Sequence, residues 1–114
     1  MKAIDVFKTL YLIYMLENKN YKIKDNIILD EVLKKSRMKK EKFYKIVDEL
    51  LKYGMLIKYE NGDVMLSEEG KKAMFDLEWY LKTMYSYSIN KYMLLVRKCF
   101  NQSINNYTSE CEAL

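Results

Sequence analysis

The 114-residue chain contains no proline and no histidine, and only three glycines and two cysteines. Without histidine, catalytic dyads that need an imidazole are excluded, and two cysteines alone are too few for a zinc site. No glycine-rich phosphate loop is present, and the adjacent acid pairs fall at expected helix starts, where negative charge suits the helix dipole. The sequence therefore predicts no catalytic residues, no metal and no cofactor.

Long apolar runs are also missing. The longest spans residues 10–16, whereas a membrane span needs roughly 18 residues. The first residues, MKAIDVFK, include an early acid and no small-residue cleavage site, so they do not read as a signal peptide. We expect a cytoplasmic protein, or one in the host cytoplasm if the source is a virus, with no membrane partner.

The two cysteines are Cys99 and Cys111. Because free cysteine is often buried, the sequence favours a small buried thiol at Cys99 and a thiol in the tail at Cys111. A disulfide is the alternative.

Positive charge is concentrated in one short segment. Residues 34–45 contain seven cations and one acid, a net charge of +6, whereas the whole chain sums to +4. Such a concentration next to a turn is typical of a surface that binds phosphates. A solvated face and a surface for an acidic protein are the alternatives.

The hydrophobic spacing predicts the order of elements along the chain. Helical spacing covers residues 3–18, and the continuous apolar run within it indicates a helix buried on more than one side. A brief strand is expected in 21–28, a two-turn helix over 29–35, a turn at 36–38 and a helix over 39–53. The inward positions of that helix are Phe43, Ile46, Val47, Leu50 and Leu51.

Glycine and serine mark the boundaries that follow. Gly54 is placed for a left-handed helix cap. Asn61 and Gly62 join two short strands, 55–60 and 63–66, and this pair of residues is a strong hairpin signal. Ser67 is the expected N-cap of the last helix, in whose first turn Gly70 is tolerable but weakening.

The last helix starts near residue 68 and has no proline to stop it. It either runs unbroken to about residue 100 or bends within residues 86–90, where side-chain hydrogen bonds compete with the helix. Its apolar residues beyond the bend need a partner surface, for which we expect a second copy of the chain, and Trp79 is either core edge or dimer contact. The self-contact is expected around Leu77, Leu81, Met84, Tyr92 and Leu95.

The order helix, strand, helix, turn, helix, hairpin, helix resembles a winged helix-turn-helix domain. Met38 and Phe43 match the apolar positions that flank the start of the family's recognition helix, and residues 50–57 match its Leu-x-x-x-Gly-hydrophobic-hydrophobic passage into the wing. The segment MLSEEGKKAM is similar to the return from the wing in MarR-like and small archaeal or archaeal-virus regulators. The resemblance covers roughly residues 3–85.

This resemblance implies a mainly α fold with a small β-hairpin wing and a long C-terminal helix. Its domain would span 1–85, followed by a helical extension over 86–102 in contact with the second copy and by a flexible tail, 103–114. The implied function is binding of double-stranded DNA by a homodimer that regulates transcription, with the third helix in the major groove.

The lysine-rich segment and the hairpin supply the candidate contacts to DNA. Lysines at the start of the third helix suit phosphates, and Tyr44 and Lys45, one turn on, suit base edges. The full set is Arg37, Lys39, Lys40, Lys42, Tyr44, Lys45, Lys58 and Asn61. The acidic hairpin tip and Asp48 favour the alternative, a winged-helix interaction module that docks on transcription machinery without touching DNA.

Overall fold

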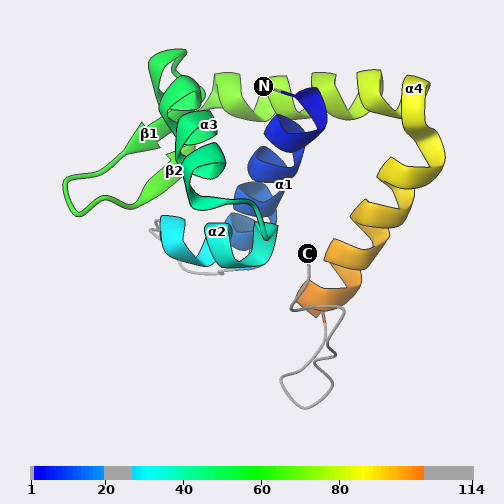
Figure 1. Cartoon of the computed structure of the whole chain (residues 1–114), viewed down its shortest axis with the longest axis horizontal. Coiled ribbons are helices and arrows are strands. Elements are labelled where there is room, and N and C mark those ends of the chain that lie inside the picture. The colour runs from blue at the N-terminus through cyan, green and yellow to red at the C-terminus, as the bar shows by residue number, and fades with distance from the viewer. Residues whose placement is uncertain (1, 20–26, 102–114) are drawn as a thin grey trace.

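A computed structural model describes residues 2–19 and 27–101 of the chain (Figure 1). These residues form a mainly helical fold of 35 × 33 × 27 Å with one antiparallel hairpin and a long C-terminal helix. Within the described residues, no helix combines the length and the apolarity needed to cross a membrane. The elements are α1 (Ala3–Lys19), α2 (Leu29–Ser36), α3 (Lys40–Lys52), β1 (Leu56–Lys58), β2 (Val64–Leu66) and α4 (Glu68–Asn101).

Helix α1 is the centre of the core, and it contacts α2, α3, β2 and α4. Phe7, Leu10, Leu12 and Ile13 are fully buried, although they do not share one side of the helix. This confirms the prediction of a helix buried on more than one side. The covering surfaces come from the chain itself, which encloses α1 between the hairpin side and the end of α4 (Figure 1).

The connection between α2 and α3 is a tight turn. Arg37 ends α2 in a left-handed conformation with φ 55°. The Ser36 hydroxyl donates to the carbonyl of Leu33 at 2.8 Å and accepts from the backbone N–H of Met38 at 3.2 Å. Met38 packs against the core, as its apolar side chain predicts.

Helix α3 agrees with its predicted pattern. Phe43, Ile46, Val47 and Leu50 are buried and Leu51 is partly buried against the core. Because Gly54 takes φ 73°, the N–H groups of Gly54 and Met55 can bond back to the carbonyls of Leu51 and Leu50. This pair of bonds is a Schellman cap, which ends the helix and leads the chain into β1.

The hairpin pairs Leu56 with Leu66 and Lys58 with Val64, as the alternation predicts. Its tip differs in detail from a two-residue turn, because only Gly62 has a positive φ. The N–H of Gly62 donates to the carbonyl of Tyr59, and the N–H of Tyr59 donates to the carbonyl of Asp63. These bonds make a three-residue loop with glycine at its left-handed position.

Part of the predicted strand over 21–28 is seen as a backbone bridge between Ile27 and Val64. Residues 21–26 lie outside the described residues, as does the predicted tail, 103–114.

Helix α4 begins against the residues that lead into the hairpin. Ser67 is its N-cap: the Ser67 hydroxyl accepts from the N–H of Gly70 at 3.0 Å and donates to the carbonyl of Gly54 at 2.5 Å. A Cβ on Gly70 would lie 2.0 Å from the carbonyl oxygen of Met55. Glycine at this position therefore permits a close approach that any larger residue prevents, and the cost of glycine in the first turn is offset by that packing.

Helix α4 bends sharply at Tyr85, which has the non-helical angles φ −139° and ψ 48°. Of the two alternatives left by the sequence, the unbroken helix is wrong, and the bend lies one residue before the stretch 86–90. Figure 1 shows that α4 changes direction at this bend and that its second half runs back on the side of α1.

The second half of α4 covers its apolar face within the chain. Ile89, Met93 and Val96 are buried. The guanidinium Nε of Arg97 donates to the Tyr11 hydroxyl at 3.2 Å, which fixes this half against α1. The expectation that a second copy covers these apolar residues is therefore wrong for the buried ones, because the bend at Tyr85 returns them to the core of the same chain.

Cys99 is buried near the end of α4 and is disulfide-bonded. The interpretation as a free thiol is wrong, and burial alone could not separate the two states because a half-cystine is as easily buried as a thiol. Cys111 lies outside the described residues.

Candidate nucleic-acid interface

Three exposed cations of the lysine-rich segment lie at the turn before α3 and at the start of that helix. Arg37, Lys39 and Lys40 are all exposed. Lys39 is the N-cap of α3, and its side chain makes no capping hydrogen bond. The first-turn N–H groups of α3 consequently lack a side-chain cap, and the positive end of the helix dipole adds to three cationic side chains.

Further along α3, the outward ridge is balanced in charge. Its exposed residues are Glu41, Lys45, Asp48 and Lys52. Acids and lysines alternate at a spacing of four or three, so this ridge has no net charge. The electrostatic attraction for phosphate therefore comes from the helix start and its surroundings rather than from the length of α3.

Lys42 points away from that ridge, toward α1. Its ammonium lies 2.8 Å from a carboxylate oxygen of Asp5, whose side chain is 14% exposed. The ion pair neutralises part of the charge that Lys42 would otherwise offer to a phosphate. Among the described residues, Lys42 is thus the one predicted lysine of α3 with an ion-pair partner inside the fold.

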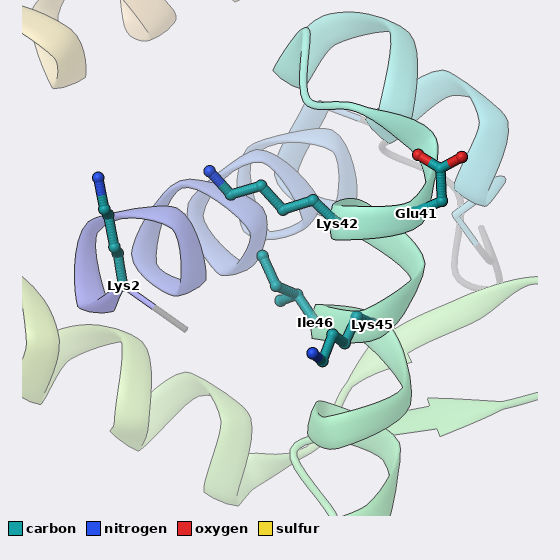
Figure 2. A pocket seen from close by; sticks show the side chains of 5 residues that line it. All are labelled: Lys2, Glu41, Lys42, Lys45 and Ile46. Carbon is teal, nitrogen blue, oxygen red and sulfur yellow. The ribbon is translucent and has the colours of Figure 1, made fainter.

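A shallow hollow lies between the start of α1 and α3 (Figure 2). It has a volume of about 350 Å³ and is lined by Lys2, Glu41, Lys42, Lys45 and Ile46. We call it the basic hollow. In Figure 2 the Lys42 side chain reaches from α3 toward the side where Lys2 lies, Lys45 is one turn further along α3, and the Glu41 carboxylate is turned away from Lys2.

Lys2 is a candidate residue that sequence reasoning missed. It lies 40 positions before Lys42 in the chain, outside the lysine-rich segment, and only the packing of α1 against α3 brings it to the basic hollow. The local signal, one lysine at a helix start, is too common to have singled it out.

Tyr44 lies on the side of α3 that faces α2. Its hydroxyl donates to a carboxylate oxygen of Asp30 at 3.1 Å, and its ring packs edge-on against Phe43 with 5.3 Å between centroids. Desolvation, followed by the bond to the Asp30 carboxylate, raises the pKa of the Tyr44 hydroxyl above its usual 10. The Tyr44 hydroxyl therefore already donates a hydrogen bond to Asp30. It would have to break this bond to donate to a nucleic-acid base.

The two hairpin candidates differ in availability. Lys58 is exposed on β1. Asn61 is occupied at the tip, where its amide nitrogen donates to the Asp63 carboxylate at 3.1 Å and its amide oxygen accepts from the Asp63 N–H at 3.0 Å. Asn61 thus stabilises the loop, and the acid beside it opposes a phosphate.

The structure places some of the predicted DNA-contact residues close together, whereas others make contacts inside the chain. Arg37, Lys39, Lys40 and Lys45 lie on or near the start of α3, and Lys58 lies on the neighbouring hairpin. Lys42, Tyr44 and Asn61 each contact an aspartate of the same chain. Across residues 2–19 and 27–101, no group of three metal-ligating side chains was found.

Comparison of the chain with protein-family models, curated proteins and solved structures finds no match. Its function must therefore be inferred from its own residues and their geometry.

Proposed function

We propose that the protein is a winged helix-turn-helix DNA-binding protein that regulates transcription as a homodimer. The order of α2, a tight turn, α3 and an antiparallel hairpin supports the assignment of the fold. In this proposal α3 is the recognition helix, and the loop between β1 and β2 is the tip of the wing.

The observation that carries the proposal is the uncapped, cationic start of α3. Arg37, Lys39 and Lys40 are exposed beside free helix N–H groups, and this combination is suited to backbone phosphates. The planar guanidinium of Arg37 matches a phosphate with two hydrogen bonds, whereas the lysines act as point charges.

The charge distribution favours phosphate contact over extensive base reading. The ridge of α3 alternates in sign and the wing tip carries Glu60 and Asp63, so few side chains are left to read base edges. Lys45 on α3 and the ring of Tyr44 are the proposed base contacts. We accordingly expect strong salt dependence and modest sequence preference.

In the homodimer, two α3 helices would enter successive major grooves about 34–36 Å apart on a roughly palindromic site. This spacing applies only if the second copy is arranged with two-fold symmetry.

The test is fluorescence anisotropy of a labelled random duplex across a salt series. The Lys39→Ala, Lys40→Ala double variant should bind all duplexes more weakly, and its salt slope should fall by about two units, one for each lost phosphate contact. Lys72→Ala and Lys98→Ala, at exposed lysines of α4, form a matched double control that should keep both affinity and slope. Unchanged affinity of the α3 variant would refute the assignment of the lysine cluster to DNA.

A second candidate function is protein docking through the same fold, which the acids Asp48, Glu60 and Asp63 favour. An absence of duplex binding by the wild-type chain even at low salt, together with no retention on heparin, would favour this candidate over DNA binding.

A further inference from the structure

The outer face of the first half of α4 carries large apolar side chains that the described residues leave exposed. Trp79 is 74% exposed, Met84 58% and Tyr80 53%. Phe75, one turn before Trp79, is half exposed and contacts Tyr14 with its ring edge-on. We call Phe75, Trp79, Tyr80 and Met84 the α4 outer face.

We propose that a second copy of the chain covers the α4 outer face, with Trp79 at or near the two-fold axis. The inference rests on the homodimer of the proposed function and locates its contact. It also replaces the contact expected from the sequence, because Leu81 is buried while Leu77, Tyr92 and Leu95 pack against the monomer core. Of the expected residues, only Met84 belongs to the exposed face.

Area sets the expected strength of the contact. Large aromatic side chains bury about 150–250 Å² each, so at these exposures the four residues together leave on the order of 500 Å² uncovered, spread around about half of the helix circumference. That is at the upper end of the roughly 300–600 Å² of the largest patches on monomers. It is below the roughly 800 Å² per partner of a standard interface, so a weak and concentration-dependent dimer is expected.

Charge complementarity favours a second copy over an unrelated partner. Asp76 lies three residues before Trp79 and Lys82 three residues after it, so the 100° advance per residue places them about 60° to either side of Trp79 around the helix. A two-fold axis beside Trp79 brings Asp76 of one copy opposite Lys82 of the other, and the reverse, when the two α4 helices cross at an angle. The ammonium of Lys82 already lies 3.4 Å from the Glu78 carboxylate, and its side chain is 38% exposed. In the dimer, the Lys82 ammonium would therefore contact a second carboxylate, that of Asp76 from the other copy, in addition to Glu78.

The same residues disfavour a basic or an acidic partner. The charged residues on and beside the α4 outer face sum to zero, although the whole chain is at +4; they are Lys72, Asp76, Glu78 and Lys82. Two copies can therefore approach through this face with less repulsion than through the cationic start of α3, which is left available for a polyanion.

The test is a charge exchange measured by sedimentation equilibrium of the full chain over a concentration series. Asp76→Lys and Lys82→Glu should each raise the dissociation constant by about tenfold or more, since each places like charges opposite one another. The double variant restores opposite charges and should recover most of the dimer. Asp48→Lys, on the exposed ridge of α3, is the matched control and should dimerise as the wild type does.

Trp79 is the only tryptophan of the chain and supplies a second readout. Its emission should shift to shorter wavelength, and acrylamide should quench it less, as the protein concentration rises. Trp79→Ala should weaken the dimer while circular dichroism stays unchanged, because an exposed side chain contributes little to the monomer fold. Tyr53→Ala, at an exposed aromatic after α3, is the control.

The outcomes separate this inference from the proposal that it rests on. A wild-type dimer that persists in Asp76→Lys, Lys82→Glu and Trp79→Ala would refute the α4 outer face and leave the homodimer intact. A wild-type chain that stays monomeric over the whole series would refute both the homodimer and its location, while duplex binding could still be measured for the monomer.

Discussion

The ammonium of Lys42 lies 2.8 Å from a carboxylate oxygen of Asp5, and this ion pair joins α3 to the first turn of α1. It divides the lysines of α3 by role. Lys42 stabilises the packing of two helices, whereas Lys40 is exposed and has no ion-pair partner among the described residues. The distinction is invisible in the sequence, where the two lysines lie two positions apart.

Substitution of Lys42 should therefore mainly lower stability, whereas substitution of Lys40 should mainly weaken duplex binding. Lys42→Gln should lower the free energy of unfolding by about 0.5–1 kcal/mol, because a partly exposed ion pair is lost and Asp5 is left unpaired. Lys40→Gln should leave stability within about 0.5 kcal/mol and weaken duplex binding more than Lys42→Gln does. Urea denaturation and anisotropy titration of both variants check this. Equal losses of affinity with equal stabilities would show that the Asp5 contact does not distinguish the two lysines.

Gly70 and Gly54 should respond differently to the same change. Gly70→Ala should destabilise the protein by about 1–3 kcal/mol, because the new Cβ would overlap the carbonyl oxygen of Met55. Gly54→Ala should cost about 1 kcal/mol for the left-handed backbone alone, since no atom lies within 4 Å of the position of its Cβ.

Substitution by asparagine distinguishes backbone strain at Gly54 from steric overlap at Gly70. Gly54→Asn should recover much of the stability lost in Gly54→Ala, because asparagine tolerates the left-handed region. Gly70→Asn should not exceed Gly70→Ala in stability. Equal rescue at both positions in urea denaturation would show that steric overlap at Gly70 is not the cause.

Glu17 should make stability depend on pH. Burial, only partly offset by the 2.6 Å hydrogen bond from the N–H of Leu66 and by nearby Lys71, raises the pKa of the Glu17 carboxyl above its usual 4.5. The folded state therefore holds this proton more tightly than the unfolded state. The resulting stabilisation is complete below the unfolded pKa and is lost as the pH rises through the folded pKa.

Glu17→Gln keeps a side-chain acceptor for Leu66 and removes the titration. The difference in unfolding free energy between this variant and the wild type should shift in favour of the variant as the pH rises from about 4 to 7. Glu60→Gln, at the exposed hairpin tip, is the matched control. A difference that stays constant over this range would contradict the raised pKa.

The hydroxyl groups of two neighbouring tyrosines should contribute differently to the stability of the fold. The rings of Tyr11 and Tyr92 are 6.4 Å apart. The Tyr11 hydroxyl accepts from Arg97, whereas the buried Tyr92 hydroxyl has no hydrogen-bond partner among the described residues. Burial raises the pKa of the Tyr92 hydroxyl, which keeps it neutral.

Tyr92→Phe should accordingly be neutral or stabilise the protein by up to about 1 kcal/mol, since it removes an unsatisfied polar group. Tyr11→Phe should destabilise it by about 1 kcal/mol through loss of the Arg97 bond. Thermal unfolding of both variants gives the comparison, and the reverse order of stabilities would overturn it.

Tyr44 is the proposed base contact with the clearest test. Tyr44→Ala should change the ranking of duplex sites, with about 1–3 kcal/mol at the affected base pair, while affinity for random duplex changes little. Tyr44→Phe loses only the exposed bond to Asp30 and serves as the control for the ring. If random and selected duplexes lose affinity equally in a binding competition, Tyr44 is not a base reader.

Most of the secondary structure followed from local pattern. The spacing of Phe43, Ile46 and Leu50 predicted α3 to within a residue at each end, because a helix places these positions on one face. The Asn61-Gly62 pair predicted the hairpin, although the loop has three residues, because only Gly62 takes the left-handed conformation. Ser67 was predicted as a cap from its place before two acids.

The candidate site was only partly predictable. The exposure of Lys39 and Lys40 followed from the helix period. The engagement of Lys42 by Asp5 and of Tyr44 by Asp30 did not, because each pair joins different helices. The sequence also gave no reason to add Lys2 to this surface.

By itself, then, the sequence determined the elements, their caps and the concentration of positive charge, since these depend on neighbours within a few positions. The tertiary structure decided that α4 bends at Tyr85, that its second half covers α1, and that Trp79 is left exposed instead of Leu81. The reason is physical: a helical stripe shows which side chains are apolar, but whether they are buried by their own chain depends on where a long helix turns back.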